Sequence, residues 1–571
     1  MIIAGAFLIY AFVGKYLPGF LHHRGYSLQR VVCHLFYNTE GIMGTPIGAC
    51  STFIFLFILF GALLEKTGIG QFFIDLCNSI AGGASGGPAK VAVLSSALLG
   101  TVSGSSVSNT VGSGSFTIPM MKKLGYKGEF AGAVEAGASV VLINNSEYEK
   151  NPSVYDDLCR NKGVLIICVE NTLHGLQDAA EKYVSKFPNL TKISVTGSSG
   201  KTTTKELLVS VFVSKFGDDV VYTKGNFNSE TGLPLSVFNI RENHKFGIFE
   251  MGMNRENEIG EISKVLKSDY GIITNIGTAH IGLLGSRENI AKEKRKSFDY
   301  ICKKSSGCGA AFVCAEDDFA DFCVENVIAN GAKVVKYGES VSGEVSGIKF
   351  LDSKGLKGTL FAVDGVEVLL PLSGKYNFLN AMGVVACAKE LGFSAEEIKI
   401  GLESFKNVAG RMEILEAKNE SGVAFNLIKD CYNANPDSMN GVLDFCDSLE
   451  NVGKKIFVLA DMKELGEKSI EAHSQIGKKL CKMNPDLCFL VGSEMQVAYD
   501  YICNSSSKIE KSVIWYKEKG SDSFSEIAKQ VNDFVSENDV VLLKGSNSME
   551  LEKIVPMICK ICVKNDKKGG C

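Results

Sequence analysis

The stretch VTGSSGKTTTKE, residues 195–206, decides the fold expected for most of this chain. Residues 192–195 predict a short β-strand before it, and the residues from Lys201 onward predict a helix after it. The glycines between them let the backbone curl, so that its N–H groups and the helix N-terminus point at phosphate oxygens. Lys201 would reach the β- and γ-phosphates, and the Thr202 hydroxyl would bind Mg²⁺. Val195 takes the place of the first glycine of the common GxxxxGK(S/T) pattern, and the alternative is a fortuitous Gly/Ser turn.

Two apolar segments further along the chain place polar residues where a nucleotide site needs them. KFGIFEMGMN, residues 245–254, predicts a strand that ends at Glu250, and YGIITNIGTAHIG, residues 270–282, predicts another that leads to His280. In parallel α/β domains, ligands and their metals lie beyond the carboxyl ends of the strands. We therefore expect both residues to line one crevice with the P-loop. Taken singly, Glu250 could be a solvated loop carboxylate and His280 a structural histidine.

Composition limits the remaining classes of function. A chain of 571 residues should form several domains, and its net charge of -4 argues against a nucleic-acid partner. The 18 cysteines are scattered among apolar neighbours, which predicts reduced thiols in a cytoplasmic setting. Cys559 and Cys562 have CxxC spacing, for which helix packing is favoured over metal or redox use.

The first quarter of the chain differs from the rest in having few charges. Residues 41–64 contain no charged side chain and are long enough to cross a hydrocarbon core of about 30 Å. Residues 91–121 are also uncharged but rich in Gly and Ser, which suggests broken or re-entrant segments. Residues 1–14 are apolar, short for a span, and lack the features of a signal peptide. The alternative is a set of buried helices in a water-soluble domain.

The end of this first quarter resembles a transport protein. GGPAKVAVLSSALLGTVSGSSVSNTVGSGSFTIPMMKKLGYKGEFAGAVEA, residues 86–136, is similar to the large permease subunit of TRAP transporters. That family carries further spans before and after the matching part, so the resemblance implies a partial permease that would not transport by itself. It also makes membrane lipid a candidate partner of residues 1–139, tethering the remainder to the inner face of the membrane.

From about residue 137 to its end, the chain resembles the Mur ligases, in particular those that add D-alanyl-D-alanine to UDP-N-acetylmuramoyl-tripeptide. The matching stretches occur in family order; among them are TGSSGKTTTKE, GNFNSETGLPLSV, EMGMNRENEIGEI, TNIGTAHIGLLGSRENIAKEK, KYNFLNAMGVVACA, AGRMEI, KDCYNANPDSM, LADMKELGEKSIEAHSQIG and LLKGSNSMELE. The resemblance implies an ATP-dependent amide ligase of peptidoglycan synthesis that works through an acyl phosphate. It also implies ATP and two Mg²⁺ ions as cofactors, with the two named compounds as partners.

The resemblance assigns roles residue by residue. The ATP-binding residues would be Gly197, Ser198, Ser199, Gly200, Lys201, Thr202, Thr203, Asn377, Asn380, Arg411, Asp430, Tyr432, Asn433 and Asn435. The metal ligands would be Thr202, Glu250, His280 and Lys294, and the catalytic set would be Lys201, Glu250, His280 and Lys294. Substrate contacts would come from Asn226, Asn228, His473 and Lys544. Lys294 matches a lysine that relatives carry as a carbamate, although Lys292, Lys294 and Lys296 could instead form an ordinary solvated face.

The expected fold class is α/β: a P-loop Mur ligase central domain and a C-terminal Rossmann-like domain, preceded by an all-α transmembrane fragment. The expected divisions are 1–139 for that fragment and 140–190 for the remnant of an N-terminal substrate domain. The central ATP-binding domain would span 191–410, the C-terminal ligase domain 411–565, and a tail 566–571. The Ser/Thr-Asp-Ser-Arg segment that grips uridine in the family is missing before the P-loop, and Tyr376, Asn547 and Lys296 replace usual His, Arg and Glu. Two other functions therefore stay open: a membrane transport component with a nucleotide-binding passenger, and a chimera that retains ATP binding alone.

Overall fold

The computed structural model describes residues 138–561, apart from gaps at 151, 154, 157–159, 161–163, 305–306, 340–346 and 506–507, and the isolated positions 10, 15, 22, 24, 26 and 27. The apolar segments 41–64 and 91–121 lie outside the described residues, as do residues 1–14 apart from Tyr10 and the tail 566–571. Among the residues that are described, no helix combines the length and the hydropathy that crossing a bilayer requires.

The chain divides into two compact units at Thr172–Leu173. In the first unit, the strands β1 (Val140–Asn144) and β2 (Leu165–Val169) pair in parallel, with α9 (Asn145–Tyr148) following β1. The unit boundary falls inside the segment 140–190 that the sequence predicts as a remnant domain.

The second unit contains a six-stranded parallel sheet that carries the P-loop. Its order is β10-β9-β6-β3-β5-β4, so the strand before the P-loop, β3, lies between the two strands that lead to Glu250 and His280. The bounds are β3 (Thr191–Thr196), β4 (Val220–Tyr222), β5 (Phe246–Glu250), β6 (Tyr270–Ile273), β9 (Ala310–Cys314) and β10 (Lys333–Tyr337). Each of the three predicted strands is confirmed, and their carboxyl ends meet at one edge of the sheet.

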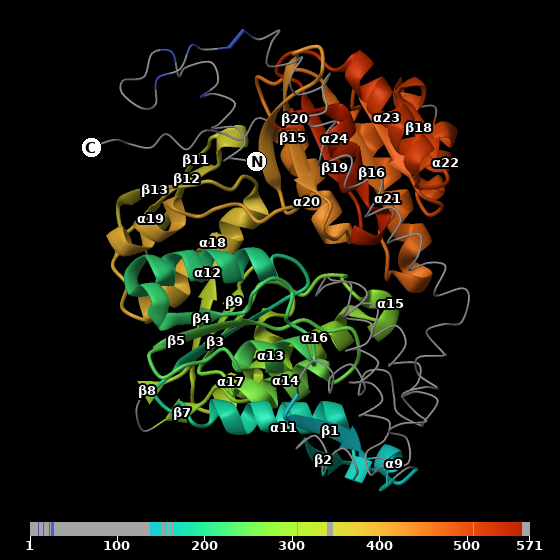
Figure 1. Cartoon of the computed structure of the whole chain (residues 1–571). Helices are drawn as coiled ribbons and strands as arrows, with labels where there is room; N and C mark the ends of the chain where they lie inside the picture. Colours follow the sequence, from blue (N-terminus) through green and yellow to red (C-terminus); the bar gives the residue numbers. More distant parts are fainter. Residues whose placement is uncertain are drawn as a thin grey trace. The chain divides into compact units, whose positions relative to one another are not determined.

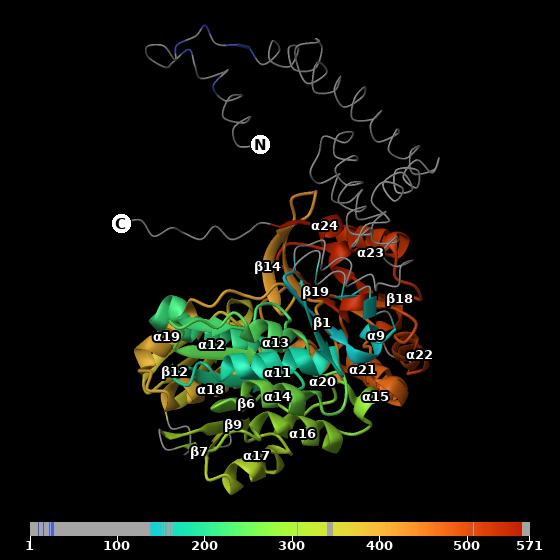
Figure 2. The same cartoon turned by 60° about the horizontal axis from the view of Figure 1, so that its bottom comes forward.

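Helices cover both faces of this sheet, and each face has its own apolar core. One face is covered by α12 (Lys201–Phe216), α18 (Lys375–Glu390) and α19 (Ala395–Glu403) (Figure 1). The other is covered by α11 (Thr172–Val184), α13 (Gly232–Val237), α14 (Glu258–Leu266), α16 (Arg287–Arg295) and α17 (Ala320–Ala329). The turned view of Figure 2 brings α11 forward. Because β3 and β6 are buried on both faces, nearly all their side chains are apolar or small, as is typical of parallel sheets.

Smaller elements complete this part of the unit. An antiparallel sheet of β11 (Ile348–Ser353), β12 (Thr359–Val363) and β13 (Val366–Leu370) precedes α18. β7 (Lys303–Lys304) and β8 (Gly307–Cys308) form a short hairpin before β9.

A second sheet, of seven strands, follows in the order β18-β17-β16-β19-β15-β14-β20. Its first five strands are parallel, and β14 and β20 run antiparallel to their neighbours. The strands are β14 (Glu413–Lys418), β15 (Ala424–Asp430), β16 (Lys455–Ala460), β17 (Leu487–Val491), β18 (Val513–Tyr516), β19 (Val540–Lys544) and β20 (Lys560–Ile561). The helices are α20 (Pro436–Ser448), α21 (Ser469–Met483) and α22 (Gln496–Asn504) on one core, and α23 (Ser521–Phe534) and α24 (Val555–Ile558) on the other. This is the Rossmann-like α/β domain that the sequence predicts.

No disulfide bond joins the cysteines whose side chains the structure describes. Most are buried, and burial raises the pKa of several, Cys314 and Cys431 to about 12. The reduced state of the cysteines stays a prediction. Cys559 is buried against the apolar core beside α23, whereas Cys562 lies outside the described residues.

Candidate active site

The P-loop turns where two glycines permit it. Gly197 has φ +148° and Gly200 has φ +81°. A Cβ at position 197 would lie 1.9 Å from Thr274 Oγ1, and one at position 200 would lie 2.5 Å from Asn380 Oδ1. Glycine is therefore required at both positions by the backbone angle and by the close approach of neighbouring side chains. Lys201, Thr202 and Thr203 then form the first turn of α12.

Asn275, which the sequence analysis did not single out, braces this loop. Its Oδ1 accepts the backbone N–H groups of Ser198, at 3.1 Å, and Ser199, at 2.9 Å. The Ser198 hydroxyl in turn accepts the N–H of Gly277 at 2.8 Å. Two of the N–H groups that we expected to face phosphate are thus used to hold the loop in place. The signal in the sequence is the position of Asn275, two residues beyond the end of β6 and therefore at the edge where the P-loop turns.

Lys201 lies folded back over the loop from which it would reach a nucleotide. Its Nζ donates to the carbonyl oxygens of Gly197, at 2.8 Å, and Ser198, at 3.3 Å. Burial lowers the pKa of Lys201 to about 8, and the nearby Arg411 charge adds to this, while Glu250 and Glu464 oppose it. The ammonium is thus held in a place that favours a negatively charged ligand beside it.

Glu250 forms the polar floor of the site. It is 1% exposed, and its Oε1 accepts the Thr202 hydroxyl at 3.0 Å and the Asn228 amide at 2.7 Å. Its Oε2 is buried and has no hydrogen-bond partner among the described residues. A buried carboxylate oxygen without a partner is costly unless a cation meets it. The Thr202 hydroxyl and the Glu250 carboxylate are hard oxygen donors of the kind that Mg²⁺ takes, with phosphate and water supplying the rest. The residues present therefore fit a magnesium ion.

Lys294 is buried rather than solvated. The residue is 0% exposed on α16, and its Nζ has no hydrogen-bond partner among the described residues. Burial lowers the pKa of Lys294 well below its usual value, and the charge of Lys201 lowers it further. The alternative of an ordinary solvated lysine face is thus wrong for this residue, while Lys296 does pair with Glu293 at 2.7 Å and Lys292 is exposed. Carbon dioxide reacts with the unprotonated form of an amine, which the lowered pKa of Lys294 favours.

His280 lies directly before α15 (Ile281–Leu284), in the left-handed conformation with φ +64°. Its Nδ1 lies 2.8 Å from Glu464 Oε2, a close contact without the alignment of a regular hydrogen bond. The backbone supports the contact, because Gly282 N–H donates to the Glu464 carbonyl at 3.1 Å. Glu464 follows β16 in the other sheet and was not among the predicted site residues.

Two further contacts bring residues of the seven-stranded sheet onto the P-loop sheet. Asn435, which caps α20, donates its amide to the Ser199 hydroxyl at 3.2 Å. Asp437 Oδ2 accepts the Thr278 N–H at 2.6 Å and the Thr278 hydroxyl at 2.9 Å. Asn435 therefore lies against the P-loop, while its binding of the nucleotide stays a prediction. Asp437 is an additional contact within the motif NPDSM.

Other residues that the resemblance assigns to nucleotide binding have contacts of their own within the protein. Asn380 abuts Gly200, whereas Asn377 is 2% exposed and donates to the Ser373 carbonyl at 2.8 Å. The Arg411 guanidinium stacks 4.0 Å from the centroid of the Tyr432 ring. Asp430 accepts the Met412 N–H at 3.2 Å, so it fixes the segment where the chain passes from one sheet to the other.

Comparison with known proteins agrees with this geometry. Residues 195–388 match the Mur ligase middle domain, and residues 410–547 match the Mur ligase glutamate ligase domain. The UDP-N-acetylmuramoyl-tripeptide--D-alanyl-D-alanine ligase of Treponema pallidum is 35% identical over 432 residues, which are 75% of this chain and 87% of that protein. This chain belongs to the Mur ligase family.

Other similar proteins support the same assignment. The Bacillus subtilis ligase of the same name is 32% identical over 428 residues, 74% of this chain and 85% of that protein. MurF from Acinetobacter baumannii has a TM-score of 0.62 at 25% identity, covering 73% of this chain and 90% of that one. MurF ligase from Thermotoga maritima in complex with ADP has a TM-score of 0.60 at 26% identity, and the match covers 74% of this chain and 94% of that one. Residues 1–142 match the DctM component of the tripartite ATP-independent periplasmic transporters, which supports the predicted fusion.

Two residues predicted to contact the substrate of this Mur ligase, His473 and Lys544, instead contact other groups of the seven-stranded sheet domain. His473 is 0% exposed; its Nε2 accepts the Met462 N–H at 3.1 Å, and its Nδ1 lies 2.8 Å from the Ser469 carbonyl oxygen. Lys544 is 1% exposed and donates to Asp430 Oδ2 at 2.6 Å and to the Asn433 carbonyl at 2.8 Å. These partners argue against direct substrate contact by either residue, because each would have to leave buried partners to reach a ligand. Of the other two predicted substrate contacts, Asn226 is exposed and Asn228 donates to Glu250 Oε1 at 2.7 Å.

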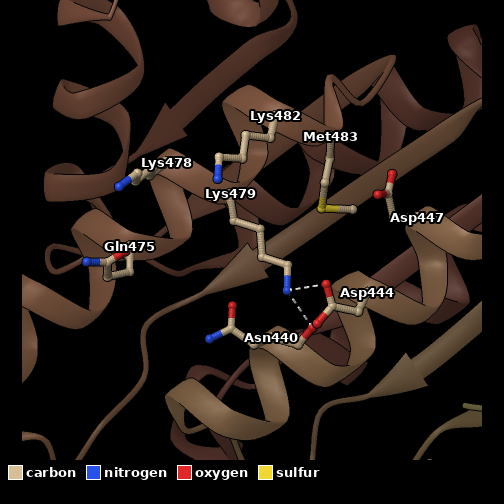
Figure 3. Close-up of a pocket in the computed structure, with 8 residues that line it drawn as sticks. All are labelled: Asn440, Asp444, Asp447, Gln475, Lys478, Lys479, Lys482 and Met483. Carbon is tan, nitrogen blue, oxygen red and sulfur yellow. Dashed lines mark hydrogen bonds and ion pairs between the residues drawn. The ribbon is translucent and has the colours of Figure 1, made fainter. Parts of the chain in front are cut away.

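A surface groove of about 470 Å³ lies away from these residues, between α20 and α21 of the Mur ligase chain. Figure 3 shows Lys479 reaching across it to Asp444, at 2.6 Å. Its lining residues are Asn440, Asp444, Asp447, Gln475, Lys478, Lys479, Lys482 and Met483. Since the lining mixes both signs of charge and includes no candidate site residue, we assign it no role.

Proposed function

We propose that this chain is an ATP-dependent amide ligase that adds D-alanyl-D-alanine to UDP-N-acetylmuramoyl-tripeptide in peptidoglycan precursor synthesis. The observation that carries the proposal is the buried Glu250–Thr202 pair beside Lys201, with one carboxylate oxygen left for a cation. The names of relatives that this chain matches over most of their length supply the two substrates. The relative solved with ADP supports ATP as the energy source.

The reaction follows from the weakness of a carboxylate as an electrophile. The terminal carboxylate of the tripeptide takes the γ-phosphoryl group of ATP, which gives an acyl phosphate and ADP. The free amine of D-alanyl-D-alanine then attacks the acyl carbon, the amide bond forms, and phosphate leaves with the bonding pair of the C–O bond. Closure of the site excludes water, which would otherwise hydrolyse the acyl phosphate.

The P-loop residues would bind the phosphates. Lys201 would leave the carbonyls of Gly197 and Ser198 and reach the β- and γ-phosphates. A triphosphate beside it would keep the ammonium charged despite its burial. With Ser198 and Ser199 held by Asn275, the N–H groups from Gly200 through Thr203 are the ones left to meet phosphate oxygens.

The metal ligands of the proposal are Thr202 and Glu250 for one Mg²⁺, and His280 and the carbamate of Lys294 for a second. A carbamate would convert the buried, unpartnered amine of Lys294 into an anion, which suits a place that already carries Lys201. Bound Mg²⁺ would neutralise charge on the transferring phosphoryl group. The protein's part is to hold these oxygen and nitrogen donors in a buried, fixed arrangement.

The nucleotide base and the second substrate would lie on either side of this centre. For the rest of ATP we propose seven further residues. Asn377 and Asn380 would lie near the adenine, Arg411 would mark the hinge into the last domain, and Asp430, Tyr432, Asn433 and Asn435 would reach the nucleotide from that domain. On the other side, Asn228 already touches Glu250, and Asn226 is exposed in the same loop, where the tripeptide would enter.

We further propose the domain division 1–139, 140–190, 191–410 and 411–565, with the ligase part acting in the cytoplasm. Residues 1–139 would contribute no step of the reaction; their apolar character makes membrane lipid the partner that they would meet as a transmembrane fragment. The competing functions are a transport component with a nucleotide-binding passenger and a chimera that only binds ATP.

One assay separates these functions. The full-length chain is given ATP, Mg²⁺, UDP-N-acetylmuramoyl-tripeptide and D-alanyl-D-alanine, and phosphate release is followed with and without the dipeptide, with mass spectrometry of the product. Dipeptide-dependent release with formation of the pentapeptide product is expected. Release that needs neither substrate would contradict the ligase and support a chimera.

A matched pair of variants ties the activity to the site. Glu250→Gln removes the buried charge beside Thr202, and we expect a loss of activity of at least a hundredfold. Glu256→Gln makes the same chemical change at an exposed position six residues further on, and it should retain full activity. Equal activity of both variants would refute the proposed role of Glu250.

A further inference from the structure

The contact between His280 and Glu464 is held by the backbone on both sides. Glu464 carries its carboxylate to 2.8 Å from His280 Nδ1, while its own carbonyl accepts the N–H of Gly282 at 3.1 Å. Gly282 approaches so closely that a Cβ there would lie 2.5 Å from Gly466 N. His280 and Glu464 both have left-handed backbone angles, φ +64° and +66°. An exposed ion pair would need none of these features.

We propose that Glu464 is a positioning residue that orients the His280 ring for a metal ion bound with the nucleotide phosphates. The inference rests on the proposed function, because it presumes a magnesium nucleotide in the P-loop. Histidines that bind metals nearly always give their other ring N–H to a carboxylate or carbonyl, which fixes the tautomer and the orientation of the ring. In the ligand-free chain His280 Nδ1 and Glu464 Oε2 are 2.8 Å apart without hydrogen-bond alignment, so a small rotation of the ring on metal binding would direct Nδ1–H at the carboxylate. That arrangement leaves the lone pair of Nε2 for the metal.

His280 and Glu464 belong to different sheets of the protein. His280 follows β6 of the P-loop sheet, whereas Glu464 follows β16 of the seven-stranded sheet. The ring is therefore oriented only while the two sheets are in contact, and the same contact includes Asp437 with Thr278 and Asn435 with Ser199. Metal binding and this contact should then favour each other by the same factor, since coupling between binding events is reciprocal.

The competing explanation is a simple surface ion pair. The Glu464 side chain is 50% exposed, and exposed pairs contribute little to stability. Under that explanation, loss of the Glu464 charge would not change how the protein binds a metal. The two explanations therefore differ in metal affinity, which can be measured without turnover.

The test measures the binding of ADP to the full-length chain by calorimetry, without metal and at increasing Mg²⁺. For Glu464→Gln we expect the apparent affinity for Mg²⁺ in the ADP complex to fall about tenfold or more, the loss typical for an outer partner of a metal ligand. The affinity for metal-free ADP should stay within about twofold of the wild type, because the residue faces the histidine rather than the loop. Glu467→Gln, an exposed carboxylate three residues away, should behave as wild type in both titrations.

Two further measurements guard against a variant that merely folds poorly. Gly282→Ala keeps both side chains but forces the backbone contact apart, so it should show the same loss of Mg²⁺ affinity. With Mn²⁺ in place of Mg²⁺, electron spin echo spectra of the wild-type ADP complex should show coupling to a histidine nitrogen, and this coupling should weaken in Glu464→Gln.

The outcomes separate the inference from the function on which it rests. Wild-type Mg²⁺ affinity and nitrogen coupling in Glu464→Gln, or an equal loss in Glu467→Gln, would overturn the role of Glu464 alone. A wild-type chain that binds no ADP with or without Mg²⁺ would overturn the proposed function, and the inference with it.

Discussion

Replacing Lys201 with methionine should make the ligand-free chain more stable near neutral pH while removing its ability to hold a nucleotide. Methionine fills a similar volume but carries no charge. In the wild type, burial lowers the pKa of Lys201 from 10.5 to about 8, so the folded protein carries a charge that its surroundings disfavour. At about 1.36 kcal/mol per pKa unit, this penalty is roughly 3 kcal/mol.

The variant also loses the two hydrogen bonds from Nζ to Gly197 and Ser198. At about 1 kcal/mol each, they offset part of the gain. The net expectation is a rise of about 1–2 kcal/mol in the free energy of unfolding at pH 7.

The sign of this difference should change with pH. Below pH 8 the lysine is protonated in the folded and the unfolded wild type, and the full penalty is present. Between pH 8 and 10.5 the unfolded chain binds more protons than the folded one, so wild-type stability rises through this window. Near pH 10 the wild type should therefore equal or exceed the variant, which has nothing to titrate at this position.

Urea unfolding of both proteins at pH 7 and pH 10 measures the difference, and calorimetry with ADP and Mg²⁺ measures binding. Lys215→Met, near the other end of α12, is the matched control and should change neither by much, since its surface pair with Glu397 contributes little. A Lys201→Met variant that is less stable than wild type by the same amount at both pH values would refute the reasoning. So would one that still binds ADP as tightly as the wild type.

Three other residues give independent predictions. If Lys294 is carbamylated as proposed, it should take up carbon-13 from labelled bicarbonate, which NMR would detect. Lys294→Gln should show neither this signal nor ligase activity. A fully active Lys294→Gln enzyme would exclude the carbamate. Asn275→Leu removes the side-chain acceptor of the Ser199 N–H, while the Ser198 N–H keeps the backbone carbonyl of residue 275 at 2.9 Å. The variant should lower the free energy of unfolding by about 1–3 kcal/mol and weaken ADP binding, whereas Asn275→Asp, which keeps a side-chain acceptor, should be milder in both assays. His473→Phe removes the acceptor for the Met462 N–H and should lower the free energy of unfolding by about 1–3 kcal/mol. The KM for D-alanyl-D-alanine should stay unchanged at a temperature where the variant is folded. A large rise in KM with unchanged stability would instead support a substrate contact by His473.

The sequence by itself determined the local structure and the kind of chemistry. Glycine spacing fixed the turn of the P-loop, because Gly197 and Gly200 adopt backbone angles that other residues rarely reach. Unbroken apolar runs fixed the strands ending at Glu250 and leading to His280, since strands buried on both faces carry few polar side chains. The order of the motifs fixed the family.

Only the tertiary structure decided which polar groups meet. Lys294 could be read as solvated or buried from its neighbours in sequence, and its environment depends on how α16 packs against the sheet. His473 and Lys544 lie in motifs that suggest a site, yet their partners come from Met462 and Asp430, which the fold brings to them. Asn275 contacts Ser199 of the P-loop, 76 positions away, and Glu464 contacts His280, 184 positions away. A periodic sequence pattern covers only neighbouring positions and cannot encode contacts over such separations. Hydrogen bonds and ion pairs depend on ångström-scale distances between such remote segments, and those distances are set by packing rather than by local pattern.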